Sequence, residues 1–280
     1  AYVDVDRERA FNAAQDPVLT DSPIITDDVN AVVGHVDGVI IAVPHHVHYP
    51  LAKPFLKAGK HVLLEKPLAN TERECLDLIA TAESGGSTLM VGYVMRYHPL
   101  WQELGRVLRE RVYGTPFQVS IWTEQYSDLS RGAWLGQAAC VGGGQLFSHG
   151  CHYIDLLLAY LGRPVSGSHV GTNLGTPWME MEGTSNVALR FENGVLGYHF
   201  GTWGARGSKL GYAVHAHCTE GMLELAFREG VLRLWRSTGD SDVPALEAAL
   251  PEGATIESER SAIIYKSPTD QRKNTCREVE

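Results

Sequence analysis

The sequence predicts an α/β domain with a parallel sheet, followed by an α+β domain with an open antiparallel sheet. The chain has 280 residues, which is enough for two domains. In its first third, short apolar runs alternate with helical patterns, and this alternation is typical of βαβ units. Beyond His98, strand-like segments follow one another without long helices. We therefore place the two domains at 1–97 and 98–280.

The first domain reads as five strands separated by helices. Asp6 and Gly59 have the residue types that begin and end helices as caps. The strands 39–43 and 62–64 are wholly apolar, which is typical of parallel strands covered by helices on both faces. The predicted strands are 1–6, 24–25, 39–43, 62–64 and 89–92, and the predicted helices are 7–15, 49–58 and 71–84.

The second domain reads as an antiparallel sheet with two helices. The Asn-Gly pair at 193–194 is a hairpin signal between two of its strands. A glycine run at 142–144 leads into the second helix, and the polar tail at 258–280 has no clear period. The predicted helices are 100–111 and 146–161, and the predicted strands are 117–124, 185–192, 195–203, 212–217 and 222–227.

The composition is that of an ordinary globular protein, with 44% hydrophobic and 20% charged residues. A net charge of -9 argues against nucleic acid or an anionic membrane as a partner. No apolar run approaches the ~20 residues of a membrane span. The five cysteines form no C-x-x-C pair, which gives no sign of a disulfide framework or a zinc ribbon. We expect a reducing compartment, the cytoplasm.

A charged pair follows the central apolar strand directly. Glu65 and Lys66 come at the carboxyl end of 62–64, and Pro67 restricts Lys66 to extended geometry. Ligands bind outside the carboxyl ends of strands in open parallel sheets, so Lys66 is well placed for chemistry. A solvated ion pair at a strand end explains the same residues equally well.

Asp4 has a comparable position at the end of the first strand. An acid there is where dinucleotide-binding folds hold the adenosine ribose. The alternative is an acid that serves a turn or a helix cap, and the residues alone favour this second interpretation slightly.

Several histidines could be metal ligands. His149 and His152 are three residues apart and can share a helix face, and His45, His46 and His48 are clustered in the sequence. No H-E-x-x-H motif or carboxylate spacing accompanies them, so we expect no metal.

Two other motifs are better explained by structural roles than by chemistry. Cys151 precedes His152, but adjacent residues on a helix point apart, so a buried structural cysteine is favoured over a thiol nucleophile. The glycine run at 142–144 lacks the Lys-Ser/Thr ending of a phosphate loop, and a tight turn explains it better.

Four ordered motifs together resemble one family. They are Pro-His-His-Val-His at 44–48, the segment Gly-Lys-His-Val-Leu-Leu-Glu-Lys-Pro-Leu-Ala at 59–69, Arg-Tyr-His-Pro at 96–99, and the stretch from the glycine run to His152 and Asp155 at 142–155. The chain thus resembles the glucose-fructose oxidoreductase / inositol dehydrogenase / MocA (Gfo/Idh/MocA) family. The resemblance runs from Ala1 to about Phe227. It implies a Rossmann domain that binds NAD or NADP, and an open sheet that supplies substrate contacts and the interface of a dimer or tetramer.

The resemblance also implies roles for single residues. The catalytic lysine of the family falls on Lys66 and its catalytic histidine on His152, and Lys66 also lies at the cofactor. In this assignment His152 is the base for a hydroxyl proton and Lys66 holds the developing alkoxide. Asp4 favours NAD over NADP because an acid repels a 2′-phosphate. The implied cofactor-binding residues are Asp4, Val43, Pro44, His45, His48, Glu65, Lys66 and Arg96.

Three departures from the family pattern bear on function. Ser148 stands where the family often has an aspartate, and we count it with the catalytic positions. Leu135 replaces an arginine that often follows the tryptophan found here at Trp134. The first Rossmann strand, its glycine-rich loop and the closing helices of the family are not found among these residues, so we expect the chain to be a piece of a longer protein.

The function implied is hydride transfer between nicotinamide and a hydroxyl or carbonyl carbon of a small sugar or cyclitol. Ser148 keeps two other functions open. One is a sensor or regulator that binds the dinucleotide without turnover. The other is an NAD-dependent glycosidase or lyase, which oxidises its sugar only transiently.

Overall fold

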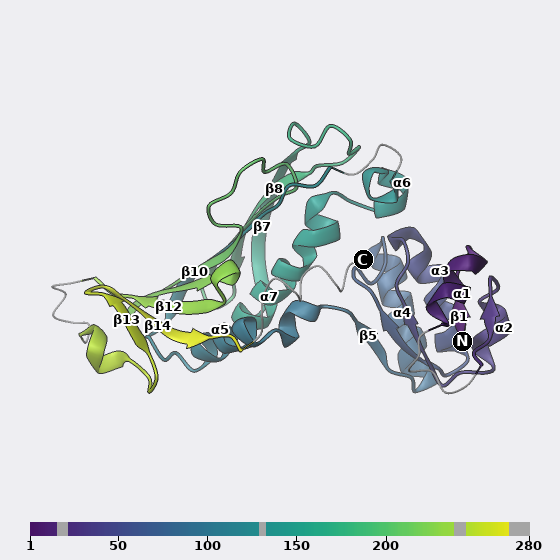
Figure 1. The fold of residues 1–280 in the computed structure, drawn as a ribbon, viewed down its shortest axis with the longest axis horizontal. Coiled ribbons are helices and arrows are strands. Elements are labelled where there is room, and N and C mark those ends of the chain that lie inside the picture. Colours follow the sequence, from purple (N-terminus) through teal and green to yellow (C-terminus); the bar gives the residue numbers. More distant parts are fainter. Residues whose placement is uncertain (16–21, 129–132, 238–244, 269–280) are drawn as a thin grey trace. The chain divides into compact units, whose positions relative to one another are not determined.

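The computed structural model describes residues 1–15, 22–128, 133–237 and 245–268, so Cys276 and the end of the polar tail lie outside it. The chain forms two compact units (Figure 1). Unit 1 comprises Ala1–Gly92 with Ala139–Gly142, and unit 2 comprises Tyr93–Ala138 and Gly143–Glu280. The division at Gly92 precedes the boundary that the sequence suggested after residue 97, and the return of a later segment to unit 1 was not foreseen.

Unit 1 contains parallel strands separated by helices, as predicted. Its strands fall into two groups, the pair β1–β2 and the three-stranded sheet β3–β4–β5, all parallel. Helices run between consecutive strands, and α1, α3 and α4 are those that the sequence indicated. The strands are β1 (Tyr2–Val3), β2 (Ile25–Thr26), β3 (Gly38–Ile41), β4 (His61–Leu64) and β5 (Leu89–Val91), and the helices are α1 (Arg7–Ala13), α2 (Asn30–Val33), α3 (His48–Lys57) and α4 (Glu72–Gly85).

Local sequence explains where the helices of unit 1 begin. Asp6 caps α1 by accepting from two backbone N–H groups. Thr71 and Glu74 form a capping box at the start of α4, in which each side chain bonds the backbone of the other residue. Gly86 ends α4 in the left-handed conformation that glycine adopts without strain.

The prediction that helices cover both faces of the apolar strands is wrong for β3. Ile41, Val62 and Leu64 are buried with α3 and α4 in one core. Ile40 points to the other face and is 75% exposed. Consecutive right-handed crossovers put α3 and α4 on the same face, and no described helix of the unit buries Ile40.

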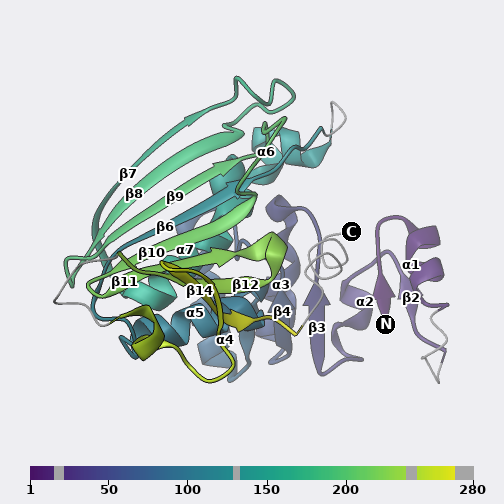
Figure 2. The same cartoon turned by 60° about the vertical axis from the view of Figure 1, so that its left-hand side comes forward.

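Unit 2 is built on one nine-stranded sheet (Figure 2). Its strand order is β13-β14-β12-β11-β10-β6-β9-β8-β7. Every neighbouring pair is antiparallel except β6 and β9, which are parallel. The strands are β6 (Pro116–Glu124), β7 (Pro164–Thr172), β8 (Thr184–Phe191), β9 (Leu196–Thr202), β10 (Tyr212–Cys218), β11 (Gly221–Ala226), β12 (Val231–Trp235), β13 (Thr255–Ser258) and β14 (Ser261–Lys266).

The sheet corrects the sequence prediction in two respects. It is mixed rather than wholly antiparallel, because helices separate β6 from β9 in the chain and allow a parallel return. The sequence also missed β7, an edge strand whose residues are almost all exposed and which therefore lacks apolar alternation. The strands β12 and β13 were not predicted either, and β14 comes from the tail at 258–280 that was left unassigned.

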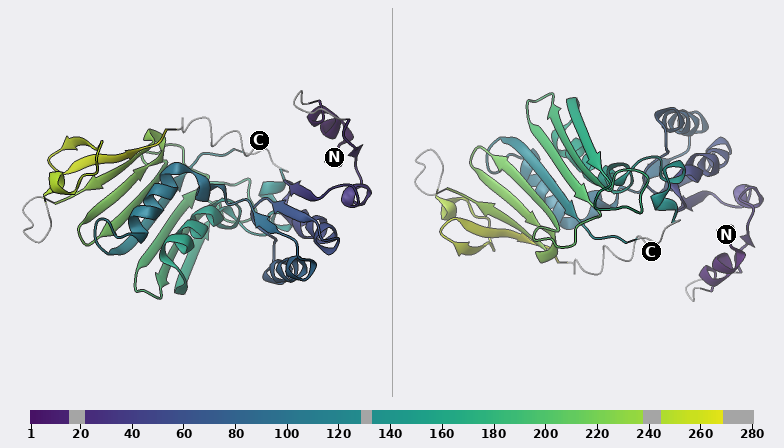
Figure 3. Two further views of the ribbon diagram at one scale, coloured as in Figure 1. Left: turned by 90° about the horizontal axis from the view of Figure 1, so that it is seen from below. Right: turned by 90° about the horizontal axis from the view of Figure 1, so that it is seen from above.

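Helices α5 (Pro99–Arg109) and α7 (Cys151–Leu161) lie on one face of this sheet (Figure 3). Trp101 of α5 and Tyr153 of α7 are among the largest fully buried side chains, and both belong to the core that includes Val119 and Leu234 of the sheet. A single α-helix was predicted from 146 to 161. Its first turn is instead the π-helical segment η4 (Leu146–Gly150), which joins α7 directly.

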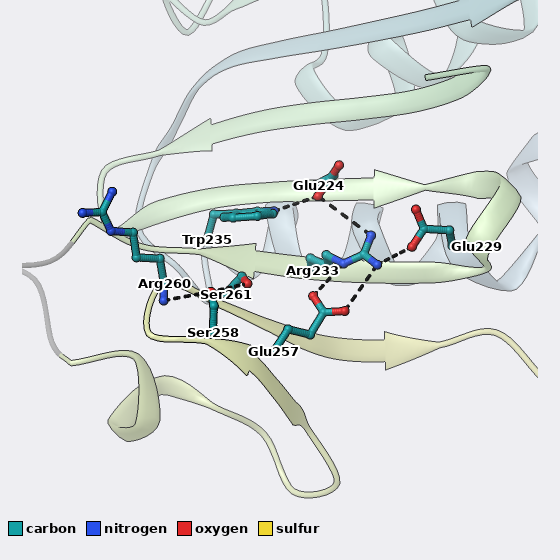
Figure 4. A network of polar contacts seen from close by, with 8 residues as sticks. All are labelled: Glu224, Glu229, Arg233, Trp235, Glu257, Ser258, Arg260 and Ser261. Carbon is teal, nitrogen blue, oxygen red and sulfur yellow. Dashed lines mark hydrogen bonds and ion pairs between the residues drawn. The ribbon is translucent and has the colours of Figure 1, made fainter. Parts of the chain in front are cut away.

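The opposite face of the sheet carries a charged network (Figure 4). Arg233 of β12 donates from Nε to Glu257 at 2.8 Å and also pairs with Glu229 and, more distantly, with Glu224. Trp235 Nε1 donates to the same Glu224 at 2.7 Å. Because side chains alternate along a strand, Arg233 faces away from the core that buries Leu232 and Leu234. The network joins β11, β12 and β13. None of the described helices is long and apolar enough to cross a membrane.

His199 of β9 is a buried titratable group in this unit. Its side chain is fully buried and stacks on Tyr153 with 5.4 Å between ring centroids. Its Nε2 lies 3.3 Å from the Thr123 hydroxyl oxygen. Burial lowers the pKa of His199 to about 4.

We predict that acid destabilises unit 2 through His199. The folded pKa is below the unfolded value, so the stability contributed by the neutral ring is complete above pH ~6.5 and is lost as the pH falls toward 4. Between these limits, wild type should lose about 3 kcal/mol more unfolding free energy than His199→Phe. All six tryptophans lie in unit 2, so tryptophan fluorescence in denaturant titrations reports this unit alone.

The matched control is His169→Phe, an exposed histidine of β7 in the same sheet. It should follow the wild-type pH dependence. Identical pH dependence of wild type and His199→Phe would contradict the prediction.

Candidate functional site

The parallel pairing of β3 and β4 brings the predicted residues of unit 1 to one sheet edge. Ile41 is opposite Leu64, so the turn after β3, with Val43 and Pro44, is next to the turn after β4. Glu65 N donates to Ile41 O at 2.9 Å and Lys66 N donates to Glu65 Oε2 at 3.2 Å. The side chains of Glu65 and Lys66 are half-buried. The position of Lys66 at the carboxyl end of the strand follows the sequence prediction.

His45 is held in one tautomer by a later part of the chain. It is 4% exposed, and its Nδ1 lies 3.0 Å from Val141 O, so the Nδ1–H donates to that carbonyl. Burial lowers the pKa of His45 to about 4, although the bond to Val141 opposes the shift. The imidazole is therefore neutral at physiological pH.

The segment Ala139–Gly142 is packed in unit 1 by a second contact. Asn70 Nδ2 donates to Cys140 O at 3.5 Å. Gly142 has φ +77°, and a Cβ there would approach the Asn70 side chain to 2.5 Å. The first glycine of the run at 142–144 thus fits the chain against Asn70, a role that a tight-turn interpretation alone did not reveal.

His48 is engaged on both sides of its ring. Its Nδ1 lies 2.7 Å from Pro67 O and its Nε2 lies 2.9 Å from Val43 O, and the residue is fully buried. Burial lowers the pKa of His48, whereas the two carbonyls raise it. These contacts give His48 a structural role between two strand ends, although the sequence motif suggested a cofactor contact.

Asp4 follows β1 and is half-buried. One of its carboxylate oxygens accepts from Asp6 N at 2.9 Å, and its own N–H donates to Thr26 O at 3.3 Å. These bonds fix the carboxylate at the carboxyl end of β1. They also match the turn interpretation, so the structure is compatible with both roles that the sequence left open.

In unit 2, the predicted histidine lies near the start of α7. His152 is 6% exposed and its ring meets that of Tyr93 edge-on at 5.9 Å between centroids. Ser148 is 2% exposed and belongs to the π-helical segment η4. The predicted helix from 146 to 161 would place Ser148 one regular α-helical turn before His152. The π-helical segment changes this spacing. Segments of π-helix occur often at functional sites.

A polar chain beside His152 was missed by the sequence analysis. Ser185 Oγ donates to Gln145 Oε1 at 3.0 Å, and Gln145 Nε2 lies 3.4 Å from His149 Nδ1. His149 Nε2 in turn lies 3.4 Å from the Tyr212 hydroxyl. Ser185 and Gln145 are fully buried. Nothing in the sequence connects these residues, because they come from η4, the residue before it and two separate strands.

Arg96 is bound within unit 2 by Asp155 of α7. Arg96 Nε and Nη2 each donate to one oxygen of Asp155 at 2.6 Å, which is a bidentate pair. The hydrogen bond to Asp155 raises the pKa of Arg96. This pairing ties η2 (Val94–Tyr97) to α7. The cofactor contact that the sequence motif implied for Arg96 stays a prediction.

Two family models match the chain. Residues 1–93 match a model described as an oxidoreductase family with an NAD-binding Rossmann fold, and residues 101–224 match the GFO/IDH/MocA C-terminal domain. The chain belongs to the Gfo/Idh/MocA oxidoreductase family. The resemblance that the four sequence motifs indicated is thus confirmed, and so is the Rossmann-like class of the first domain.

Curated members of the family are similar over most of this chain. Inositol 2-dehydrogenase 2 of Saccharopolyspora erythraea is 30% identical over 203 residues, which are 70% of this chain and 56% of that protein. The 2,7-anhydro-N-acetylneuraminate hydratase of Escherichia coli is 27% identical over 216 residues, which are 72% of this chain and 55% of that protein. The chain spans little more than half the length of these relatives.

Solved structures of the family share the fold. A levoglucosan dehydrogenase in complex with NADH and levoglucosan has a TM-score of 0.76 at 22% identity, over 86% of this chain and 67% of that one. The aldose-aldose oxidoreductase from Caulobacter crescentus has a TM-score of 0.76 at 21% identity, over 95% and 75% respectively. Within the described ranges, no group of three or more His, Cys, Asp or Glu side chains is arranged to hold a metal ion.

We predict that Arg96→Lys destabilises unit 2, because lysine cannot form the bidentate pair with Asp155. The Arg96 side chain is 48% exposed and that of Asp155 is 11% exposed, so solvent weakens the pair. The expected loss is about 1 kcal/mol of unfolding free energy, measured by tryptophan fluorescence in denaturant. Arg163→Lys, at an 83% exposed side chain 3.8 Å from Glu192, is the control and should cost much less. Equal losses in the two variants would contradict a structural role for Arg96.

Proposed function

We propose that the whole protein transfers a hydride between nicotinamide and a hydroxyl or carbonyl carbon of a sugar, cyclitol or related small molecule. The observation that carries this proposal is the placement of Lys66 at the carboxyl end of β4, next to the turn after β3, in a family described as NAD-binding oxidoreductases. The names of relatives agree with it, among them an inositol 2-dehydrogenase and a 1,5-anhydro-D-fructose reductase.

The residues at the strand ends of unit 1 fit a dinucleotide. Asp4 offers a half-buried carboxylate, oriented by Asp6 N, that suits the hydroxyls of a ribose. Val43 and Pro44 offer half-buried apolar surface that suits the flat face of nicotinamide. Glu65 and Lys66 lie on the neighbouring turn. We propose these five residues as the cofactor contacts within this chain, with NAD preferred to NADP.

We propose an indirect role for three other predicted cofactor residues, His45, His48 and Arg96. His45 donates to Val141 O, His48 lies between two carbonyls, and Arg96 is paired with Asp155. We propose that these three side chains shape the site through those partners, and that the cofactor is bound by the other residues.

The proposed chemistry divides between Lys66 and His152. When bound, the nicotinamide accepts or supplies the hydride. In the oxidative direction His152 takes the proton of the substrate hydroxyl, since imidazole has an ordinary pKa near operating pH. Lys66 holds the developing alkoxide by charge and hydrogen bonding. In the reductive direction the same groups return the proton and polarise the carbonyl.

Ser148 supports a second candidate function. A serine cannot carry the charge of the aspartate that the family often has there, so the site has one ionisable group fewer. A hydratase is among the relatives, and its name states a reaction without net oxidation of a substrate. A lyase, hydratase or glycosidase that uses NAD only transiently would release product without net formation of NADH. Parallel measurement of NADH absorbance and of product decides between the two.

We also propose a homo-oligomer, a dimer or tetramer, in the cytoplasm. The face of the sheet opposite α5 and α7 supports an interface, because it exposes large apolar side chains, those of Trp235 beside the network of Arg233 and of Leu196 on β9. Analytical ultracentrifugation of the whole protein tests the association.

We predict that Lys66→Ala and His152→Ala each lower kcat of the whole protein by about 10²-fold or more, because each removes an interaction that strengthens in the transition state. The Kd for NAD should change much less. Lys60→Ala, at the opposite end of β4, and His169→Ala, on the exposed edge strand, are the matched controls and should keep wild-type kcat. Full activity of His152→Ala would require another base, with Tyr93, His98 and His149 as the candidates.

We predict that Asp4 determines cofactor preference. The carboxylate repels a 2′-phosphate and bonds the ribose hydroxyls, so the wild-type protein should bind NAD more tightly than NADP. Asp4→Ser should narrow this difference by about tenfold, measured by calorimetric titration of the whole protein with both dinucleotides. Asp6→Ser, two residues later, is the control, because serine keeps the N-cap of α1 while a neighbouring carboxylate is removed. Equal binding of NAD and NADP by wild type would contradict the assignment.

A further inference from the structure

The imidazole ring of His48 connects the turns that follow two neighbouring strands of unit 1. It is the first residue of α3, and its ring spans the space between Val43 O, after β3, and Pro67 O, after β4. The contacts of 2.7 and 2.9 Å are as short as good hydrogen bonds, and no solvent reaches the residue. A group that is fully buried between two carbonyls has little surface left for a cofactor.

One of the two carbonyls, Pro67 O, is on the residue that follows Lys66, and the other, Val43 O, is in the turn after β3. Pro67 follows Lys66 directly, and Glu65, which precedes it, donates its N–H to Ile41 O of β3. The backbone is therefore fastened to β3 or to its following turn on both sides of Lys66. Since the side chain of Lys66 starts between these two anchors, their position decides where its ammonium group can reach.

Few side chains can replace this ring. The two nitrogens of imidazole are on different sides of a rigid five-membered ring, so one residue reaches two carbonyls in different turns. The neutral ring donates to one of them, and the imidazolium donates to both. Glutamine places both donors on a single nitrogen, and phenylalanine has none.

We propose that His48 is a positioning residue for Lys66, holding the turn after β4 against the turn after β3 so that the lysine is directed at the reacting oxygen. This inference rests on the proposed function of Lys66. A displacement of about 1 Å at a catalytic group reduces turnover by up to ~10²-fold, whereas cofactor contacts on other residues are kept. Loss of His48 should therefore lower kcat and leave cofactor binding nearly intact.

The kinetic test compares His48→Phe and His48→Gln with His46→Phe in the whole protein. His46 is the matched control because it is exposed and only two residues away in the same loop. We expect kcat to fall about tenfold or more in His48→Phe and less in His48→Gln, with the Kd for NAD within about threefold of wild type. A weaker Kd for NAD at unchanged kcat would overturn the proposal, because it would make His48 a cofactor ligand.

A second measurement follows Lys66 without turnover. Lysines of the whole protein are reductively dimethylated with ¹³C-formaldehyde and a borohydride, and Lys66→Arg assigns the Lys66 resonance. We expect His48→Phe to move this resonance toward that of the exposed Lys57, and His46→Phe to leave it unchanged. If His48→Phe does not fold, His48→Gln replaces it, with a smaller shift in the same direction.

The two measurements separate the possible failures. If His48→Phe moves the Lys66 resonance but the wild-type whole protein shows no turnover, the positioning role is supported and the proposed function is contradicted. An unmoved Lys66 resonance in a folded His48 variant overturns the positioning role, whatever the turnover is.

Discussion

The parallel register of β3 and β4 is the constraint on which the candidate site of unit 1 depends. Because Ile41 is opposite Leu64, the turns that follow both strands share one edge of the sheet. Apolar burial stabilises this pairing, since Ile41, Val62 and Leu64 are buried with α3 and α4 in one core. The polar residues of the candidate site come where each strand ends. Burial of the strands thus fixes the backbone from which Lys66 extends.

Buried histidines complete this arrangement. Burial lowers the pKa of His45 and of His48, and both rings are bonded to backbone carbonyls. Such rings act as rigid polar spacers between segments that are distant in sequence. His45 joins the turn after β3 to Val141, and His48 joins it to Pro67. Unit 2 uses the same principle in His199, which stacks on Tyr153 within the core.

The sequence predicted those features that depend on local pattern. The βαβ alternation, the cap of α1 and the place of Lys66 at a strand end follow from residue type and period. Features that depend on distant partners escaped it. The parallel pairing of β6 with β9, the bond of Asn70 to Cys140, and the pair of Arg96 with Asp155 join segments whose own patterns say nothing of one another. The edge strand β7 was missed because an exposed strand has no buried side to create alternation.

The central claim is that the whole protein oxidises a carbinol carbon by direct hydride transfer, with Lys66 and His152 acting on the hydroxyl. A polyol substrate deuterated at the reacting carbon tests it most directly, with mass spectrometry of the recovered dinucleotide. The account predicts that reduced nicotinamide carries the deuterium in proportion to the carbonyl product, and that Lys66→Ala and His152→Ala lower both together. Product that accumulates while the dinucleotide stays oxidised and unlabelled would contradict it.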